Sequence, residues 1–430
     1  MPVTQSPPRL TFWKDLSAGP TPVHPPTPYS PRVLVVGGGV TGLITAWTLL
    51  DKGYYVTVLA KEWASYGKEQ RLTSQIAGAL WEFPPAVCGQ HTDAISLHHS
   101  KRWSMVSYHI WDAIASEADL ADASGVRMKG ADFFFPMPVE EDPAQLHKMR
   151  EIMASGVRGF RHDPALIEER NVSPAYGAID AYEHLAPVID TDRAMTWLMN
   201  LVRRKGAKLI TRTLRGDLLD QEMALRTEYD ADAIVNATGL AGTELAGDAT
   251  CYPIRGGLIR VRNDGRDYPR IDHALTISAD AANVNEIVFL VPRNDDVLII
   301  GGIAQSNEWQ LDLALDSPII QRMRARCEAF LPALKKAQLD EAYPLAQGLR
   351  PFRQHNVRVE RELRAPKDTA APYSRIIHSY GQGGAGWSLS FGCAGDVLAL
   401  VEEALLDKAP TAMAIEQTSR PAPPEFSARL

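Results

Sequence analysis

The chain has 430 residues, 45% of them hydrophobic and 23% charged, with a formal net charge of −7. This length exceeds one simple core and indicates two interleaved domains of a globular protein. The acidic balance argues against nucleic acid or an anionic membrane as the main partner, and no apolar run reaches the roughly 18 residues of a spanning helix. The cysteines form no CxxC pair, so we expect a reducing compartment and neither a disulfide framework nor a bound metal; they are Cys88, Cys251, Cys327 and Cys393.

The two ends of the chain have separate characters. Residues 1–31 contain nine prolines, which predicts a disordered or surface-wrapping arm rather than a signal peptide. Residues 409–430 form the expected C-terminal tail, which ends in Ala428-Arg429-Leu430. This triplet is a conservative variant of the Ser-Lys-Leu peroxisomal address. We therefore expect a peroxisomal location and an import receptor as partner, with a chance match and a cytoplasmic location as the alternative.

A strand–turn–helix–strand pattern opens the folded part. The apolar run 33–36 predicts a strand buried on both faces, 40–50 has helical character, and 54–59 is a second β-rich run. Between the first two lies GGGVTG, which fits GxGxxG: Gly37 permits the tight turn, Gly39 admits a pyrophosphate and Gly42 lets helix and strand pack. The helix that Val40 and Thr41 begin offers its N–H groups and positive dipole end, so the motif predicts a dinucleotide site.

Two further positions bear on which dinucleotide is bound. The second strand is followed by Lys61 and Glu62, where an acidic residue usually receives the ribose hydroxyls. Either Glu62 reaches the ribose or Lys61 pairs with phosphate, and a lysine could also indicate NADPH. The turn Asn236-Ala237-Thr238-Gly239 follows a predicted strand at 231–236 and is typical of a second backbone approach to the cofactor in two-domain flavoproteins. Thr238 and Gly239 are therefore candidate FAD contacts.

The rest of the chain divides into a part with predicted helices and a part rich in predicted strands. Helices are predicted at 97–114 and at 191–205, the latter capped near Asp190 or Thr191. Beyond 251 the chain is β-rich at 258–261, 287–291 and 297–300, with a hairpin connection at 293–295. A helix follows at 317–330, further β-rich runs at 357–359 and 376–377, and a last helix at 394–406.

Three more segments carry a resemblance to a family. They are TSQIAGALW at 73–81, QGLRPFR at 347–353 and IHSYGQGGAGW at 377–387. With the glycine turn and YPIRG at 252–256, they closely resemble the D-amino-acid oxidase family, in order from about Arg32 to Asp407. The chain is similar to a divergent, fungal-type member, with Ser379 where asparagine is commonest.

The resemblance implies an α/β two-domain flavoprotein with a Rossmann-like FAD-binding domain and a mixed-sheet substrate domain. The first would comprise 32–82, 190–250 and 372–408, and the second mainly 83–189 and 251–371. Non-covalent FAD is implied, and glycine suits backbone that lies against the flat flavin ring. The candidate contacts added by the resemblance are Thr73, Ser74, Ala77, Gly78, Ala79, Gly383, Gly384, Ala385, Gly386, Trp387 and Ser388.

At the substrate end, the resemblance places Arg350 as the clamp of a substrate carboxylate, a role for which the guanidinium fork is suited. Phe289 and Asn285 stand where the family often has tyrosines, and Ala304 leaves no cation for a second carboxylate. Acidic substrates are therefore disfavoured. Arg353, Arg358 and Arg361 are interpreted as solvated or paired surface charges.

The implied activity is oxidative deamination of a neutral or apolar D-amino acid, with hydride transfer to flavin N5 and release of hydrogen peroxide. Molecular oxygen and a small amino acid or amine would be the reactants, and a homodimer is an open alternative. Two other functions stay open: an amine or imino-acid oxidase of a specialised biosynthetic pathway, and a non-catalytic flavoprotein.

Overall fold

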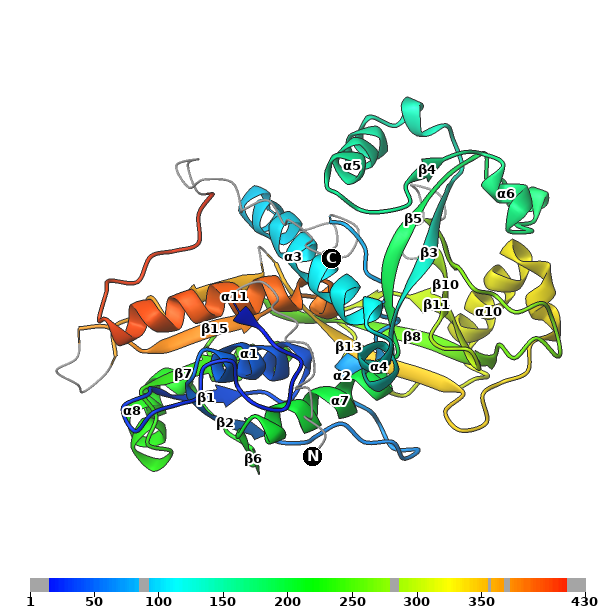
Figure 1. Ribbon diagram of the computed structural model, residues 1–430. Helices are drawn as coiled ribbons and strands as arrows, with labels where there is room; N and C mark the ends of the chain where they lie inside the picture. The colour runs from blue at the N-terminus through cyan, green and yellow to red at the C-terminus, as the bar shows by residue number, and fades with distance from the viewer. Residues whose placement is uncertain (1–14, 85–92, 279–285, 355–356, 367–371, 416–430) are drawn as a thin grey trace, which may run out of the picture.

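The computed structural model describes residues 15–84, 93–278, 286–354, 357–366 and 372–415. Several positions discussed above lie outside these ranges: Cys88, Asn285 and the terminal triplet at 428–430. Within the described ranges the strands form two sheets, which lie side by side in Figure 1.

The first sheet has six strands within the described residues, in the order β14–β15–β7–β1–β2–β6. Its central strands pair in parallel, and β14 is antiparallel to β15. After Arg32 the sequence of β1 is wholly apolar, so this strand can be buried on both faces, with Val33 opposite Val56 and Ala233. The strands are β1 (Arg32–Val36), β2 (Tyr55–Ala60), β6 (Lys208–Thr211), β7 (Ala233–Asn236), β14 (Arg358–Arg361) and β15 (Ile376–Tyr380).

One layer of helices packs on this sheet through a single large core. Helix α1 lies beside α11, and α11 in turn lies against α3 (Figure 1). Trp47, Trp111 and Phe391 meet in this core, with both tryptophans packing edge-on against the phenylalanine ring. The helices associated with this half are α1 (Val40–Asp51), α2 (Thr73–Ile76), α3 (Ala94–Ser116), α4 (Ala118–Ser124), α7 (Thr191–Arg204), α8 (Leu218–Glu228), α9 (Gly242–Leu245) and α11 (Gly386–Leu405).

The second sheet has nine strands within the described residues and is mostly antiparallel. Its order is β12–β8–β11–β10–β9–β3–β5–β4, and β13 pairs with the other edge of β8. The strands are β3 (Val126–Phe135), β4 (Arg161–His162), β5 (Asp180–Ile189), β8 (Cys251–Arg262), β9 (Ala274–Ser278), β10 (Glu286–Pro292), β11 (Val297–Ile303), β12 (Gln305–Ser306) and β13 (Leu345–Arg353).

The two faces of the second sheet have different coverings. Helix α10 (Pro318–Phe330) covers one face, where Ile320 and Met323 pack with Ile259, Val288 and Ile300. Helices α5 (Pro143–Ala154) and α6 (Leu166–Glu169) lie at the far end in Figure 1. The opposite face packs against residues 76–83 and Tyr108 of α3, which lie toward the first sheet. Within the described residues, no helix combines the length and apolarity needed to cross a bilayer.

The described part of the N-terminal arm wraps the first sheet's helices. Leu16 is buried in the main core, and the Ser17 and Val23 N–H groups donate to the Asp51 carboxylate. Lys205 pairs with Asp51 at 2.6 Å, with both side chains buried, and also donates to the Thr21 carbonyl. The surface-wrapping alternative thus describes residues 15–31.

The last helix begins earlier in the structure than the sequence predicts. Helix α11 begins at Gly386 rather than at residue 394, although Gly392 lowers helix propensity. A Cβ on Gly392 would collide with Trp103, so close packing of α3 on α11 requires that glycine. Helix α3 and strand β14 also pack with the first sheet, although their residues fall in ranges assigned mainly to the second domain.

Candidate active site

The glycine turn after β1 has no room for side chains at two positions. Gly37 has a φ of 128°, and a Cβ there would collide with the Ala237 carbonyl. A Cβ on Gly42 would collide with the carbonyl of Gly37 itself. At Gly39, by contrast, an added Cβ would meet a single described atom within 4 Å, the Ser74 Oγ at 3.1 Å. The turn is therefore tight at its ends and approachable at its middle.

Two helix N-termini converge beside this turn. Helix α1 begins at Val40 and α11 at Gly386, and a Cβ on Gly386 would lie 3.5 Å from the Val40 Cγ1. The Val40 N–H donates to the Ser74 Oγ at 3.0 Å, and Trp387 Nε1 donates to the Ser74 carbonyl at 2.8 Å. Each N-terminus contributes N–H groups and a positive dipole end, which together favour an anion.

The residues at this convergence fit the diphosphate of FAD. Neither 37–42 nor 383–388 contains an acidic residue that would repel phosphate. Thr41 lies in the first turn of α1, and the buried Ala385 and Ser388 lie at the start of α11. The donor set is thus backbone N–H groups and hydroxyls, as a diphosphate requires.

The carboxyl end of β2 reaches the same turn. Lys61 Nζ pairs with Glu62 Oε1 at 3.1 Å, and both side chains are exposed. Among the described residues, each side chain is paired only with the other. Contact of Glu62 with the ribose and contact of Lys61 with a phosphate therefore both stay open. The sequence analysis missed Trp63, whose ring lies 3.0 Å from a Cβ placed on Gly38 and whose Nε1 donates to Thr211 Oγ1.

Buried polar side chains form hydrogen bonds that fix the Ala-Thr-Gly turn. Asn236 Oδ1 accepts from the Thr238 hydroxyl at 2.7 Å, and its Nδ2 contacts His378 Nδ1 at 3.3 Å. His378 is buried, and its Nε2 lies 3.2 Å from Glu362. Burial lowers the pKa of His378, although the hydrogen bond to Glu362 opposes that shift. Gly239, with a φ of 59°, packs against Pro351 of β13.

One face of the second sheet meets the segments expected beside the flavin. Directly paired residues of antiparallel strands lie on the same face of a sheet. The pairing of β10 with β11, of β11 with β8 and of β8 with β13 therefore places Phe289, Gly348 and Arg350 on one face. The Phe289 ring lies against Gly78, and Gly348 lies against Ile76 of α2. The Thr73 hydroxyl donates to the Leu349 carbonyl at 3.2 Å. Segment 73–79 therefore spans this face, with Ala77 and Ala79 beside Gly78 and Ala79 at a φ of 52°.

Phe352 marks the other end of the same face. Its ring lies 2.8 Å from a Cβ placed on Gly383, and the Gly383 N–H donates to the Pro351 carbonyl. Gly384, the next residue, is exposed. Arg350 thus lies on the strand between two backbone segments, 73–79 and 383–386, that the sequence placed near the flavin. The contact of these segments with FAD itself stays a prediction.

Arg350 has the environment of an anion-binding residue. Its guanidinium lies over Gly256, whose added Cβ would be 2.7 Å from Arg350 Cζ, and its Nη1 donates to the Ile303 carbonyl at 3.1 Å. Burial is the cause that lowers the pKa of Arg350. Among the described residues no carboxylate pairs with it, although the residue retains some solvent access. A partly buried cation without a counter-charge favours binding of an incoming carboxylate.

Arg293 is a second buried arginine, which the sequence analysis placed only in a hairpin connection. It donates to the carbonyls of Gln75 and Ala77, the latter at 2.5 Å, and to the Thr191 hydroxyl. Burial lowers its pKa to about 10, against the opposing charge of Asp190. Arg293 therefore ties the backbone next to Gly78 to α7. No local motif indicates this role, because the contacts are more than 100 residues apart.

The prediction that Arg353, Arg358 and Arg361 are surface charges was wrong about their location. Arg353 pairs with Asp248 at 2.7 Å and Arg358 with Glu360 at 2.8 Å, and both side chains are largely buried. Arg361 is 1% exposed and donates to the Ser374 carbonyl. The alternating charges of 358–362 suggest a solvated strand, but α11 and the C-terminal segment cover β14.

The comparisons with known proteins agree with this arrangement. Residues 32–400 match the family model described as DAO, FAD dependent oxidoreductase. The chain is 29% identical over 374 residues to a D-amino-acid oxidase of Rubrobacter xylanophilus, covering 87% of this chain and 97% of the relative. It is 27% identical over 375 residues to a human D-aspartate oxidase, covering 86% and 95%.

Solved structures show the same fold. A glycine oxidase from Bacillus cereus superposes with a TM-score of 0.63 at 17% identity, covering 90% of this chain and all of the other. The fold and the site thus define an FAD-dependent oxidoreductase with two domains. This chain belongs to the DAO family, and FAD is its cofactor.

Proposed function

We propose that this protein oxidises neutral D-amino acids at the α-carbon, with oxygen as the final acceptor. The products would be a 2-oxo acid, ammonia and hydrogen peroxide. The observation that carries the proposal is Arg350, a partly buried cation without a described carboxylate partner, between the two segments 73–79 and 383–386. The relatives that share 29% identity and bear the name D-amino-acid oxidase support the choice of substrate class.

The protein's own residues would bind and orient the substrate. Arg350 holds the carboxylate through the fork of its guanidinium, which fixes the position of the α-carbon. Phe289 packs on Gly78 and keeps water from that side. When bound, FAD supplies the two-electron acceptor for the α-hydrogen, so the protein needs no strong base or nucleophile.

Phe289 also favours a second candidate, an amine or imino-acid oxidase. A phenylalanine offers no hydroxyl to a carboxylate, so part of the two-point recognition of an amino acid rests on Arg350 alone. A substrate with a secondary amine and one carboxylate would still satisfy this site. D-proline and N-methylated amino acids test that candidate beside primary D-amino acids.

The experiment is anaerobic reduction of the purified holoenzyme. D- and L-enantiomers of alanine, leucine and proline are mixed with the protein, and loss of flavin absorbance is followed. We expect D-leucine to bleach the flavin and L-leucine to leave it oxidised, and peroxide to appear once air is admitted. Bleaching by L-enantiomers alone, or by no amino acid, would contradict the proposal.

A further inference from the structure

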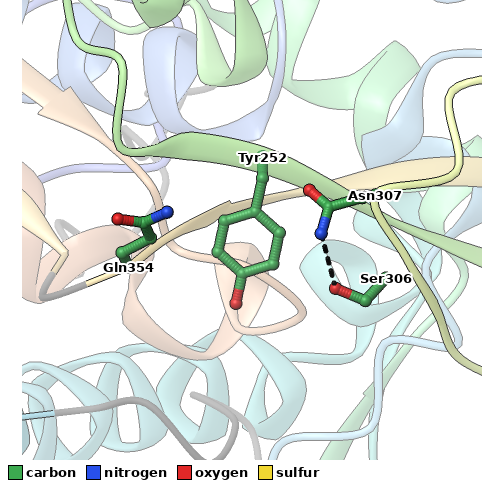
Figure 2. Close-up of a pocket in the computed structure, with 4 residues that line it drawn as sticks. All are labelled: Tyr252, Ser306, Asn307 and Gln354. Atoms are coloured by element: carbon green, nitrogen blue, oxygen red, sulfur yellow. Dashed lines mark hydrogen bonds between the residues drawn. The ribbon is translucent and has the colours of Figure 1, made fainter.

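A polar pocket lies on the same sheet face as Arg350. Its volume is about 270 Å³, and Tyr252, Ser306, Asn307 and Gln354 line it (Figure 2). The Tyr252 ring extends away from β8, with its hydroxyl in the space between Gln354 and the Ser306–Asn307 pair (Figure 2). None of these lining residues is charged, and all carry groups that form hydrogen bonds.

The register of the strands connects this pocket to Arg350. Ile254 of β8 pairs with Arg350 on one side and with Ser306 on the other, so the three side chains lie on one face. Tyr252 pairs with Phe352, and their ring centroids are 5.9 Å apart. The pocket therefore continues the face from the Arg350 guanidinium over Gly256 toward the beginning of β8.

The lining groups keep unused hydrogen-bonding capacity. Asn307 has a φ of 58°, and its N–H donates to the Pro253 carbonyl at 2.8 Å, so its backbone is fixed. Asn307 Nδ2 donates weakly to Ser306 Oγ at 3.4 Å, which leaves its Oδ1 available. The Tyr252 hydroxyl and the Gln354 side-chain amide have no hydrogen-bond partner among the described residues, although the Gln354 backbone N–H donates to the Thr250 carbonyl. Donors and acceptors thus face one space.

We propose that this pocket receives the substrate side chain and selects one that is uncharged and both donates and accepts hydrogen bonds, as a carboxamide does. The inference rests on the proposed function. An apolar side chain would desolvate the lining groups without replacing their hydrogen bonds, and a charged one would find no counter-charge there. At about 3.3 Å per residue, Tyr252 is about 13 Å along β8 from Gly256, which favours a long side chain over a short one.

Three D-amino acids of nearly equal shape test this selection. D-glutamine carries the carboxamide, D-homoleucine replaces it with an isopropyl group, and D-glutamate replaces it with a carboxylate. Steady-state kcat/KM is measured for each with the FAD-loaded protein. We expect D-glutamine to exceed both others by about tenfold or more, because unpaired polar groups in a site reject an apolar analogue.

Variants of the lining residues assign any preference to this pocket. Tyr252→Phe and Ser306→Ala each remove one hydroxyl and should reduce the ratio of kcat/KM for D-glutamine over D-homoleucine by about fivefold or more. Tyr29→Phe, at a position 95% exposed, is the matched control and should keep the ratio. The flavin spectrum of each variant verifies that FAD is retained, and binding of the unreactive 4-carbamoylbutanoate, followed by the same spectrum, gives a readout without turnover.

The outcomes separate this inference from the proposed function. If no D-amino acid reduces the flavin, the proposed function fails and the inference fails with it. If D-leucine reduces the flavin but D-glutamine is no better than D-homoleucine, or D-glutamate is best, the inference alone is overturned. A glutamine preference that neither variant alters would also overturn the assignment to Tyr252 and Ser306.

Discussion

The Phe289 ring of β10 lies directly against the backbone of Gly78, which follows α2. The contact leaves no space for a Cβ on Gly78 unless the Phe289 ring or the backbone moves, so glycine gives the closest fit between the second sheet and segment 73–79. Because Gly78 belongs to the backbone expected beside the flavin, this contact links the substrate sheet to the cofactor site.

Gly78→Ala should disturb FAD binding through Phe289. The added methyl group must displace the ring or the backbone, at a cost of about 1–3 kcal/mol. We expect the FAD dissociation constant, measured by quenching of flavin fluorescence, to rise by about tenfold. Gly67→Ala is the control, because its Cβ would meet only the Glu69 nitrogen at 3.9 Å. Wild-type FAD affinity in Gly78→Ala would contradict this explanation. So would a double variant Gly78→Ala/Phe289→Ala that binds FAD as weakly as Gly78→Ala alone.

Arg293→Met should loosen the same backbone from the other side. The substitution leaves the Ala77 carbonyl without its donor in a buried site, which costs about 1–3 kcal/mol, whereas the Gln75 carbonyl keeps the Thr191 hydroxyl as donor. We expect a lower free energy of unfolding in urea together with weaker FAD binding, and partial recovery of both in Arg293→Lys. Lower stability with an unchanged FAD dissociation constant would show that Arg293 does not position the flavin-facing segment.

The ionised Asp248 carboxylate makes the stability of the fold sensitive to acid. Burial alone would raise the pKa of its carboxyl, but the Thr250 hydroxyl, the Arg353 charge and the Tyr380 hydroxyl outweigh burial and lower that pKa to about 2. Since the folded pKa is below its ordinary value, the stabilisation is complete above about pH 4 and disappears as the pH falls through the folded pKa. It amounts to about 2 kcal/mol.

Urea unfolding as a function of pH measures this contribution. Asp248→Asn should lower the free energy of unfolding at pH 6 by about 2 kcal/mol and flatten its decline between about pH 4 and pH 2. Asp295→Asn, in an exposed ion pair, is the control and should keep the wild-type profile. An equally steep acid decline in Asp248→Asn would assign the sensitivity to other groups.

Local sequence signals predicted the starts of several helices well. The helix at Thr191 begins where expected, with the Asp190 side chain accepting from the Arg193 N–H, and α1 and α10 begin at Val40 and Pro318. These starts depend on caps, prolines and glycine turns, which act over a few residues. The family resemblance then supplied the position of Arg350, which spacing alone could not.

The parts that sequence reasoning missed depend on distant contacts. Arg293 gains its role from Ala77, and Tyr252 gains its place in the pocket from Ser306 of a separate strand. Burial of Arg361 depends on the covering of β14 by a helix that begins 25 residues later in the chain (361 to 386). Such neighbours are set by sheet register and layer packing, which no local pattern encodes.

Removal of the Arg350 charge tests the central claim most directly. Arg350→Met keeps much of the side-chain volume but loses the donors for a carboxylate, worth about 2–3 kcal/mol as charge-assisted hydrogen bonds. We expect the apparent dissociation constant for a D-amino acid, from anaerobic flavin reduction, to rise by about 30-fold to 100-fold, with FAD affinity retained. Arg266→Ala, at an exposed arginine, is the control. An unchanged dissociation constant in Arg350→Met would remove Arg350 from the substrate site and contradict the account.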